Sequence, residues 1–315
     1  MFQLMKADKT IDFMRWSKGA FFLSAFMIIA AIATVTTQKL NWGLDFTGGT
    51  LIEVGFEEPA NLPKIRESLE GAGFGDAIVQ NFGTARDVMV RLQPRENVKS
   101  EDLGNQIIAA LKTGTGQTVE MRRIEFVGPN VGDELAEAGG LAILVSLLCI
   151  LLYVSVRFEW RLAAGAVLAL AHDVIITIGI FSFTQIEIDL TIVAALLTVV
   201  GYSLNDTIVV FDRIRENFLK MRKDDAVEVL NSSITQTLSR TLITSATTLF
   251  VVIALFLKGG NMIHGFATAL LIGITVGTYS SIYVASALSL KLGIKREHLM
   301  PTPVDKEGEE FDAMP

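Results

Sequence analysis

The sequence predicts a polytopic α-helical membrane protein with six transmembrane helices and one small α+β domain outside the membrane. Half of the 315 residues are apolar and only 19% are charged, whereas a soluble domain carries roughly 25% charged residues. The apolar residues fall into six long blocks, and one long polar segment follows the first block. The single cysteine, Cys149, excludes a disulfide-stapled secreted scaffold, and its apolar surroundings predict a buried thiol.

The six apolar blocks have the length of membrane spans. A span needs about 20 mostly apolar residues, because the hydrocarbon core is about 30 Å thick and an α-helix rises about 1.5 Å per residue. The first block could also be a cleaved signal peptide, but its length and the lack of a small-x-small cleavage site favour a retained anchor. The predicted spans are residues 19–38, 138–156, 162–186, 190–211, 231–257 and 265–290.

The lysines and arginines beside the spans predict that both termini lie in the cytoplasm, because positively charged short loops stay on that side. The two short loops on the opposite side hold only Lys258. We therefore expect residues 39–137 outside the cytoplasm. The expected cytoplasmic segments are the N-terminus (1–18), the link 157–161, the loop 212–230 and the tail 291–315.

Residues 39–137 predict a single domain with the ferredoxin-like order βαββαβ. Alternating apolar residues indicate the strands, and apolar residues at helical spacing indicate the helices. The segment holds ten Lys or Arg and sixteen Asp or Glu residues. This acidity suits a solvated surface, with a docking surface for a basic client as the lesser alternative. The predicted elements are strand 50–56, helix 62–71, strand 77–81, strand 87–92, helix 100–113 and strand 118–127.

Two acidic residues inside the spans are candidate functional residues, because a charge at the bilayer centre costs about 2.5 kcal/mol or more. Asp173 lies about 16 Å into the third predicted span, near mid-bilayer. Asp206 follows Ser203 and Asn205 in the fourth span. Either acid could instead be a structural hydrogen-bonding residue, and for Asp173 the nearby His172 and Thr177 could supply partners.

Arg240 is the only charge in the fifth span. It could be a snorkelling anchor if the helix begins near residue 241. However, Gln236, Arg240, Thr244 and Thr247 form one polar stripe at helical spacing. Such a stripe favours a partner on a neighbouring helix, and we expect Asp206 to be that partner.

The sixth span carries a small residue at every fourth position, which we call the small-residue ladder. Small side chains allow two membrane helices to approach closely. The ladder therefore predicts tight helix packing, either within this chain or against a partner. It comprises Gly265, Ala269, Gly273, Gly277, Ser281, Ala285 and Ser289.

Several enzyme classes lack their motifs in this sequence. It has no Walker-type phosphate loop and no HExxH, CxxC or GxSxG motif. The three histidines are His172, His264 and His298, and their separation has no ligand-like spacing. We therefore expect no metal, no cofactor and no nucleic acid partner.

Seven motifs, in a single order along the chain, resemble the SecF branch of the SecD/SecF family of bacterial protein-export membrane proteins. The resemblance extends over nearly the whole chain. Its most distinctive part is Asp45, Phe46, Thr47, Gly48 and Gly49, directly after the first span. The matching segments are residues 41–50, 122–129, 158–161, 171–174, 201–206, 212–217 and 240–245.

The resemblance implies a role in protein export at the bacterial inner membrane. Family members belong to the resistance-nodulation-division superfamily and pair with SecD. The pair associates with the SecY–SecE–SecG channel and with YajC, and uses the proton or sodium gradient to help preproteins leave at the periplasmic side. The implied ion-coupling residues are Asp206 and Arg240, with Asp173 as a lesser candidate and Ser203, Asn205 and Thr244 as their polar neighbours.

Three alternatives compete with this interpretation. An intramembrane aspartyl protease could use Asp173 and Asp206, but its typical Tyr-Asp and Gly-x-Gly-Asp motifs are not found here, and Arg240 disfavours a shared proton. A small-solute exporter of the same superfamily would have larger external domains. A passive scaffold of the Sec channel would make the buried charges merely structural. For an active subunit, we expect motion to reach the external domain through the first two spans.

Overall fold

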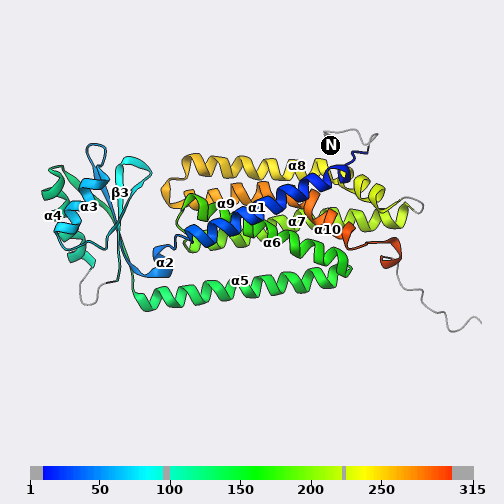
Figure 1. The fold of residues 1–315 in the computed structure, drawn as a ribbon, viewed down its shortest axis with the longest axis horizontal. Helices are drawn as coiled ribbons and strands as arrows, with labels where there is room; N and C mark the ends of the chain where they lie inside the picture. Colours follow the sequence, from blue (N-terminus) through cyan, green and yellow to red (C-terminus); the bar gives the residue numbers. More distant parts are fainter. Residues whose placement is uncertain (1–9, 95–99, 222–224, 300–315) are drawn as a thin grey trace, which may run out of the picture.

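The computed structural model describes residues 10–94, 100–221 and 225–299. A long helical bundle and a small sheet domain lie end to end (Figure 1). The start of α1 (Ser17–Gln38) and α10 (Ser286–Lys291) lie at the end of the bundle that points away from the sheet domain. The fold therefore places the ends of the described chain on the side opposite the sheet domain.

The sheet domain confirms the predicted βαββαβ order. Its four strands pair in the order β2-β3-β1-β4, and each neighbouring pair is antiparallel, which is the ferredoxin-like arrangement. The elements are β1 (Gly49–Phe56), α3 (Leu62–Gly71), β2 (Ile78–Phe82), β3 (Thr84–Leu92), α4 (Ser100–Thr115) and β4 (Val119–Val127).

One face of the sheet and the inner faces of α3 and α4 form the core of this domain. Ile52 and Val54 alternate along β1 and are fully buried, as are Ile65 of α3 and Ile107 of α4. Burying an aliphatic side chain of this size contributes about 1.5–3 kcal/mol. The strand period of two and the helical period of 3.6 thus direct one set of apolar residues to a common core.

Six helices in the described residues are long and apolar enough to cross a membrane, which agrees with the polytopic fold predicted above. The last of them passes through a π-helical turn, Ser280–Ala285, before α10. A 3₁₀ turn, Met14–Trp16, precedes the first helix, another, Arg296–His298, follows α10, and the one-turn helix α2 (Leu44–Thr47) precedes β1. The long helices are α1 (Ser17–Gln38), α5 (Pro129–Arg157), α6 (Trp160–Thr184), α7 (Leu190–Lys220), α8 (Ala226–Lys258) and α9 (Asn261–Tyr279).

The bundle has an interior made by α6, α7 and α9 and a periphery made by α1, α5 and α8. Helix α1 packs on α6, and α8 packs on α7 and α9. Helix α5 runs along the outside of the bundle (Figure 1) and exposes most of its apolar side chains. The prediction of a buried Cys149 is therefore wrong, since its side chain lies on the exposed surface of this outer helix.

Several helix boundaries differ from the sequence expectation. Most of the expected loop 212–230 is helical, because α7 continues to Lys220 and α8 begins at Ala226. Ile214 and Phe218 bury their side chains in the bundle core, and Asn217 Nδ2 donates to Ser233 Oγ at 2.9 Å. These contacts hold the two helix ends together. Helix α5 also begins at residue 129 rather than 138.

Candidate functional site

Asp173 on α6 lies in a buried polar cluster with residues of two helices. Its carboxylate Oδ1 is 2.8 Å from His172 Nδ1, and its Oδ2 accepts a hydrogen bond from Ser203 Oγ of α7 at 2.5 Å. All three side chains are at most 3% exposed. The carboxylate therefore joins α6 to α7, beyond the local contact with His172 that the sequence indicated.

Helix α9 closes this cluster through Gly277. A Cβ at this position would lie 3.0 Å from the Cβ of Ser203 and 3.5 Å from Asp173 Oδ2. Glycine thus allows α9 to approach the carboxylate. Three residues later α9 enters its π-helical turn at Ser280, a departure from α-helical geometry that is frequent at functional sites.

Asp206 on α7 occupies a second buried position, one helical turn beyond Ser203 and on the same face. The side chain is 3% exposed. Ser245 Oγ of α8 lies 3.5 Å from Asp206 Oδ2 in donor geometry and 2.8 Å from Thr278 Oγ1 of α9. Tyr202 completes the group with its hydroxyl 3.5 Å from Ser245 Oγ. The carboxylate lies where α7, α8 and α9 meet.

Arg240 interacts electrostatically with Asp206, but the two side chains form no direct ion pair in the described part of the chain. Helix α8 begins at Ala226, so Arg240 is well inside the helix and not at its end. Its side chain is exposed, however, and no ion pair within 4.0 Å joins it to Asp206. The reason is the orientation of α8 around its own axis. The helix turns Ser245 toward the Asp206 carboxylate and Arg240 away from it.

The polar stripe that faces the interior of the bundle is one residue away from the predicted stripe. Thr237, Thr241 and Ser245 are buried on α8, whereas Gln236 and Arg240 are exposed. One residue corresponds to a rotation of about 100° around the helix. The spacing of Thr237, Thr241 and Ser245, four residues apart, was the available signal for this inner face.

The other predicted neighbours lie away from the two carboxylates. Asn205 is exposed on the outer face of α7, although it is adjacent to Asp206 in sequence. Thr244 is half-buried and donates its hydroxyl to the main-chain oxygen of Arg240 at 3.0 Å. Thr278 was not among the predicted residues, because its role depends on how α9 packs.

The small-residue ladder packs within this chain, against α7 in its first part and against Gly165 of α6 at Ala285 and Ser289. A Cβ on Gly265 would lie 3.1 Å from Ile192, and a Cβ on Gly273 would lie 2.2 Å from Val199. Four further ladder residues are also fully buried. They are Ala269, Ser281, Ala285 and Ser289.

The motif Asp45–Gly49 forms a tight passage from α2 into β1. Asp45 Oδ2 accepts a hydrogen bond from the main-chain N–H of Leu190 at 3.0 Å. Gly48 and Gly49 have φ values of +63° and +119°, which favour glycine. A Cβ on Gly49 would lie 2.2 Å from the Leu92 carbonyl oxygen. Phe46 packs against the bundle core, and Thr47 Oγ1 accepts a hydrogen bond from Arg91 of β3 in the sheet domain.

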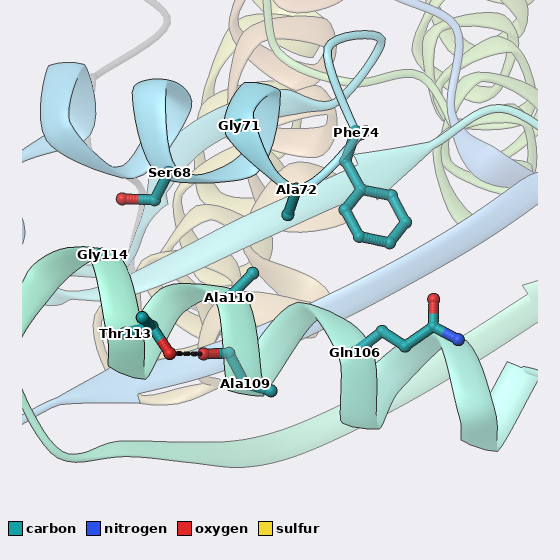
Figure 2. Close-up of a pocket in the computed structure, with 9 residues that line it drawn as sticks. All are labelled: Ser68, Gly71, Ala72, Phe74, Gln106, Ala109, Ala110, Thr113 and Gly114. Carbon is teal, nitrogen blue, oxygen red and sulfur yellow. Dashed lines mark hydrogen bonds between the residues drawn. The ribbon is translucent and has the colours of Figure 1, made fainter.

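A groove of about 500 Å³ lies in the sheet domain between α3 and α4. Figure 2 shows the two helices facing each other across it, with Phe74 at one end. None of the lining residues is ionisable, so the groove is chemically unlike the two buried acid positions. The lining residues are Ser68, Gly71, Ala72, Phe74, Gln106, Ala109, Ala110, Thr113 and Gly114.

Together, the fold and the two buried acids define a multi-pass membrane protein with carboxylates at helix junctions, the kind of position that marks ion pathways in membranes. Two family models match the chain. Residues 107–295 match the model "Protein export membrane protein SecD/SecF, C-terminal". Residues 34–60, a range that includes Gly48 and Gly49, match the model "SecD/SecF GG Motif".

Known proteins give the same result. The chain is 78% identical to protein translocase subunit SecF of Vibrio alginolyticus over the full length of both chains. It is 55% identical to protein translocase subunit SecF of Escherichia coli O157:H7, covering 97% of this chain and 95% of the relative. The chain belongs to the SecD/SecF family, and its relatives place it in the SecF branch.

Two crystal structures of SecDF show the same fold. The structure of the translocon-associated membrane protein SecDF from Thermus thermophilus matches with a TM-score of 0.83 and 38% identity. The match covers 93% of this chain and 39% of that longer chain. SecDF in a super-membrane-facing form matches with a TM-score of 0.67 at 39% identity, covering 93% and 40%.

Proposed function

We propose that this chain is the SecF subunit of the Sec protein translocase and works together with SecD. The chain spans about two fifths of the SecDF chain that it matches, and SecD is the partner that we propose for it. The SecY–SecE–SecG channel, YajC and the translocating preprotein are the further partners. The pair uses an ion gradient, of protons or of sodium, to promote late translocation and release of the preprotein.

The proposed location is the bacterial inner membrane, with the sheet domain in the periplasm and both termini in the cytoplasm. The cations in residues 1–18, 212–230 and 291–315 support this orientation. The start of α1 and α10, which lie at the end opposite the sheet domain (Figure 1), are consistent with it. A reporter that is active only outside the cytoplasm tests the orientation when fused after Gly116 or Lys223.

The position of Asp206 is the observation that carries the coupling proposal. A carboxylate that is 3% exposed at the meeting point of α7, α8 and α9 changes the packing of three helices when its charge changes. In the charged form it accepts from Ser245, and in the neutral form it can donate. Moving one charge across 100 mV supplies about 2.3 kcal/mol. This free energy biases a two-state packing by a factor of roughly 50.

Arg240 acts from the outer face of α8 in this proposal. Its exposed side chain can meet another chain of the complex, and its stem is long enough to cover apolar surface. Asp173 is the second acid, and its two side-chain partners, His172 and Ser203, support a mainly structural role. The different TM-scores of the two SecDF structures, at nearly equal identity, support a family fold with more than one shape.

The test is preprotein translocation into membrane vesicles, measured with and without an imposed ion gradient. Asp206→Asn keeps the side-chain shape and removes the titratable group. We expect the variant to insert, to co-purify with SecD, and to lose the gradient-dependent part of translocation. Asn205→Ala is the matched control, because Asn205 is adjacent in sequence but exposed.

The passive scaffold makes the opposite prediction. It requires a fully assembled Asp206→Asn complex to translocate as the wild type does in the presence of the gradient. That outcome would exclude ion coupling through this residue. Loss of gradient dependence in the Asn205→Ala control would show that the effect is not specific to the buried carboxylate.

A further inference from the structure

The sheet domain contacts the bundle at a place distant in sequence from the spans that flank it. The segment after α1 pairs with the turn between α6 and α7 as a short parallel bridge between Trp42 and Ile188. Gly43 N donates to the Ile188 carbonyl at 2.7 Å, and Ile188 N donates to the Asn41 carbonyl at 2.8 Å. We call residues 41–47 together with residues 185–190 the junction.

Side chains extend this main-chain pairing in both directions along the turn. Asn41 Nδ2 donates to the Gln185 carbonyl at 2.9 Å, at the end of α6. Asp45 Oδ2 accepts from Leu190 N at 3.0 Å and so caps the first turn of α7. The junction therefore holds the ends of the two helices that carry Asp173 and Asp206.

Arg91 of β3 connects the junction to the sheet. One guanidinium nitrogen donates to the Trp42 carbonyl at 2.7 Å and to Glu187 Oε1 at 3.1 Å. The other donates to Thr47 Oγ1 at 2.5 Å. The side chains of Arg91 and Glu187 are 11% and 21% exposed. A planar guanidinium can make these bonds together, whereas a lysine ammonium lacks the fork.

The junction has little free space for relative movement of its parts. A Cβ on Gly43 would lie 2.8 Å from the Ile188 carbonyl oxygen. A Cβ on Gly132 of α5 would lie 3.0 Å from Gly48 N, so the start of α5 is also close. Contacts of this kind move as a unit, because a packed contact has few intermediate arrangements.

We propose that Arg91 is a positioning residue that transmits displacement of α6 and α7 to the periplasmic sheet domain through the junction. The inference deepens the proposed function and rests on it. The sequence suggested that movement reaches the domain through the spans on either side of it. The contacts of Arg91 provide a third route, which begins at the helices that hold the buried acids.

The experiment compares gradient-dependent preprotein translocation in vesicles for Arg91→Ala, Arg91→Lys and Arg86→Ala. Recovery of SecD with each variant is measured in the same membranes. Arg86 lies on the same strand and is exposed, so its substitution is the matched control. We expect Arg91→Ala to lose the gradient-dependent part of translocation, Arg91→Lys to recover part of it, and Arg86→Ala to retain it.

Wild-type stimulation by a fully assembled Arg91→Ala complex would overturn the inference. If Arg91→Ala does not assemble, Thr47→Val takes its place, because it removes one partner of Arg91 and keeps the volume of the side chain. Loss in Thr47→Val supports the route, and full retention overturns it. Asp206→Asn is measured in parallel. Retained stimulation there contradicts the proposed function itself, whereas its loss together with retention in Arg91→Ala contradicts only the route.

Discussion

Substitution of Gly273 by alanine tests how closely α9 and α7 pack. An added Cβ would lie 2.2, 2.5 and 2.9 Å from the Cγ2, Cγ1 and Cβ atoms of Val199, whereas carbon atoms in contact are about 3.5–4.0 Å apart. Valine is stiff at χ1 and cannot turn away. The helices must therefore separate by about 1 Å, and overpacking of this kind costs about 1–3 kcal/mol.

Gly201→Ala is the matched control for this prediction. Gly201 lies on α7, and a Cβ there meets nothing within 4 Å. In both variants, replacing a helical glycine by alanine stabilises the backbone by the same amount, about 0.5–1 kcal/mol. The difference between them isolates the clash, and we expect Gly273→Ala to be less stable by about 1–3 kcal/mol in reversible detergent unfolding. Equal stability of the two variants would refute the close contact between α7 and α9.

Three further predictions follow from other contacts. Ser203→Ala should destabilise the bundle by about 1–3 kcal/mol, because the buried Asp173 carboxylate loses its donor; unchanged detergent unfolding would contradict this. Burial raises the pKa of Glu187 above its ordinary value of 4.5, despite the nearby Arg91. The protonated side chain therefore contributes its full stability below about pH 4.5, and this stability is lost as the pH rises through the raised pKa. Glu187→Gln should flatten unfolding curves measured from pH 4 to 7, and an unaltered pH dependence would exclude the assignment. Asn231→Ala should speed protease cleavage ahead of α1, because its Oδ1 accepts from Met14 N at 2.9 Å; equal cleavage rates would count against that contact.

Features with a short-range sequence signal could be predicted. Each of the six spans is a continuous apolar block. In the sheet domain, apolar residues alternate along the strands and recur at helical spacing along the helices. The predicted helix 62–71 coincides with α3, and the predicted strand 118–127 differs from β4 by one residue. The buried acids could be found as well, since an ionisable residue in an apolar block stands out by itself.

Features that depend on distant contacts could not be predicted. The spacing of the polar residues along α8 shows that the helix has a polar stripe. Which face of α8 is buried, however, depends on the positions of α7 and α9. For this reason Ser245 rather than Arg240 lies against Asp206. The bond from Leu190 to Asp45 joins residues 145 positions apart, and no local pattern indicates such a pairing. The π-helical turn after Tyr279 likewise has no local signal.

We propose that ion binding at Asp206 moves the sheet domain relative to the bundle. The direct measurement is the distance between spin labels at Lys112→Cys on α4 and Lys258→Cys at the end of α8. Both positions are exposed, and the only native cysteine is replaced by Cys149→Ala. The distance is recorded in vesicles that contain the complex with SecD, with and without an ion gradient. We expect the gradient to change the distance distribution in the otherwise wild-type protein and to leave it unchanged in Asp206→Asn. The same gradient-dependent change in both proteins would contradict the proposal.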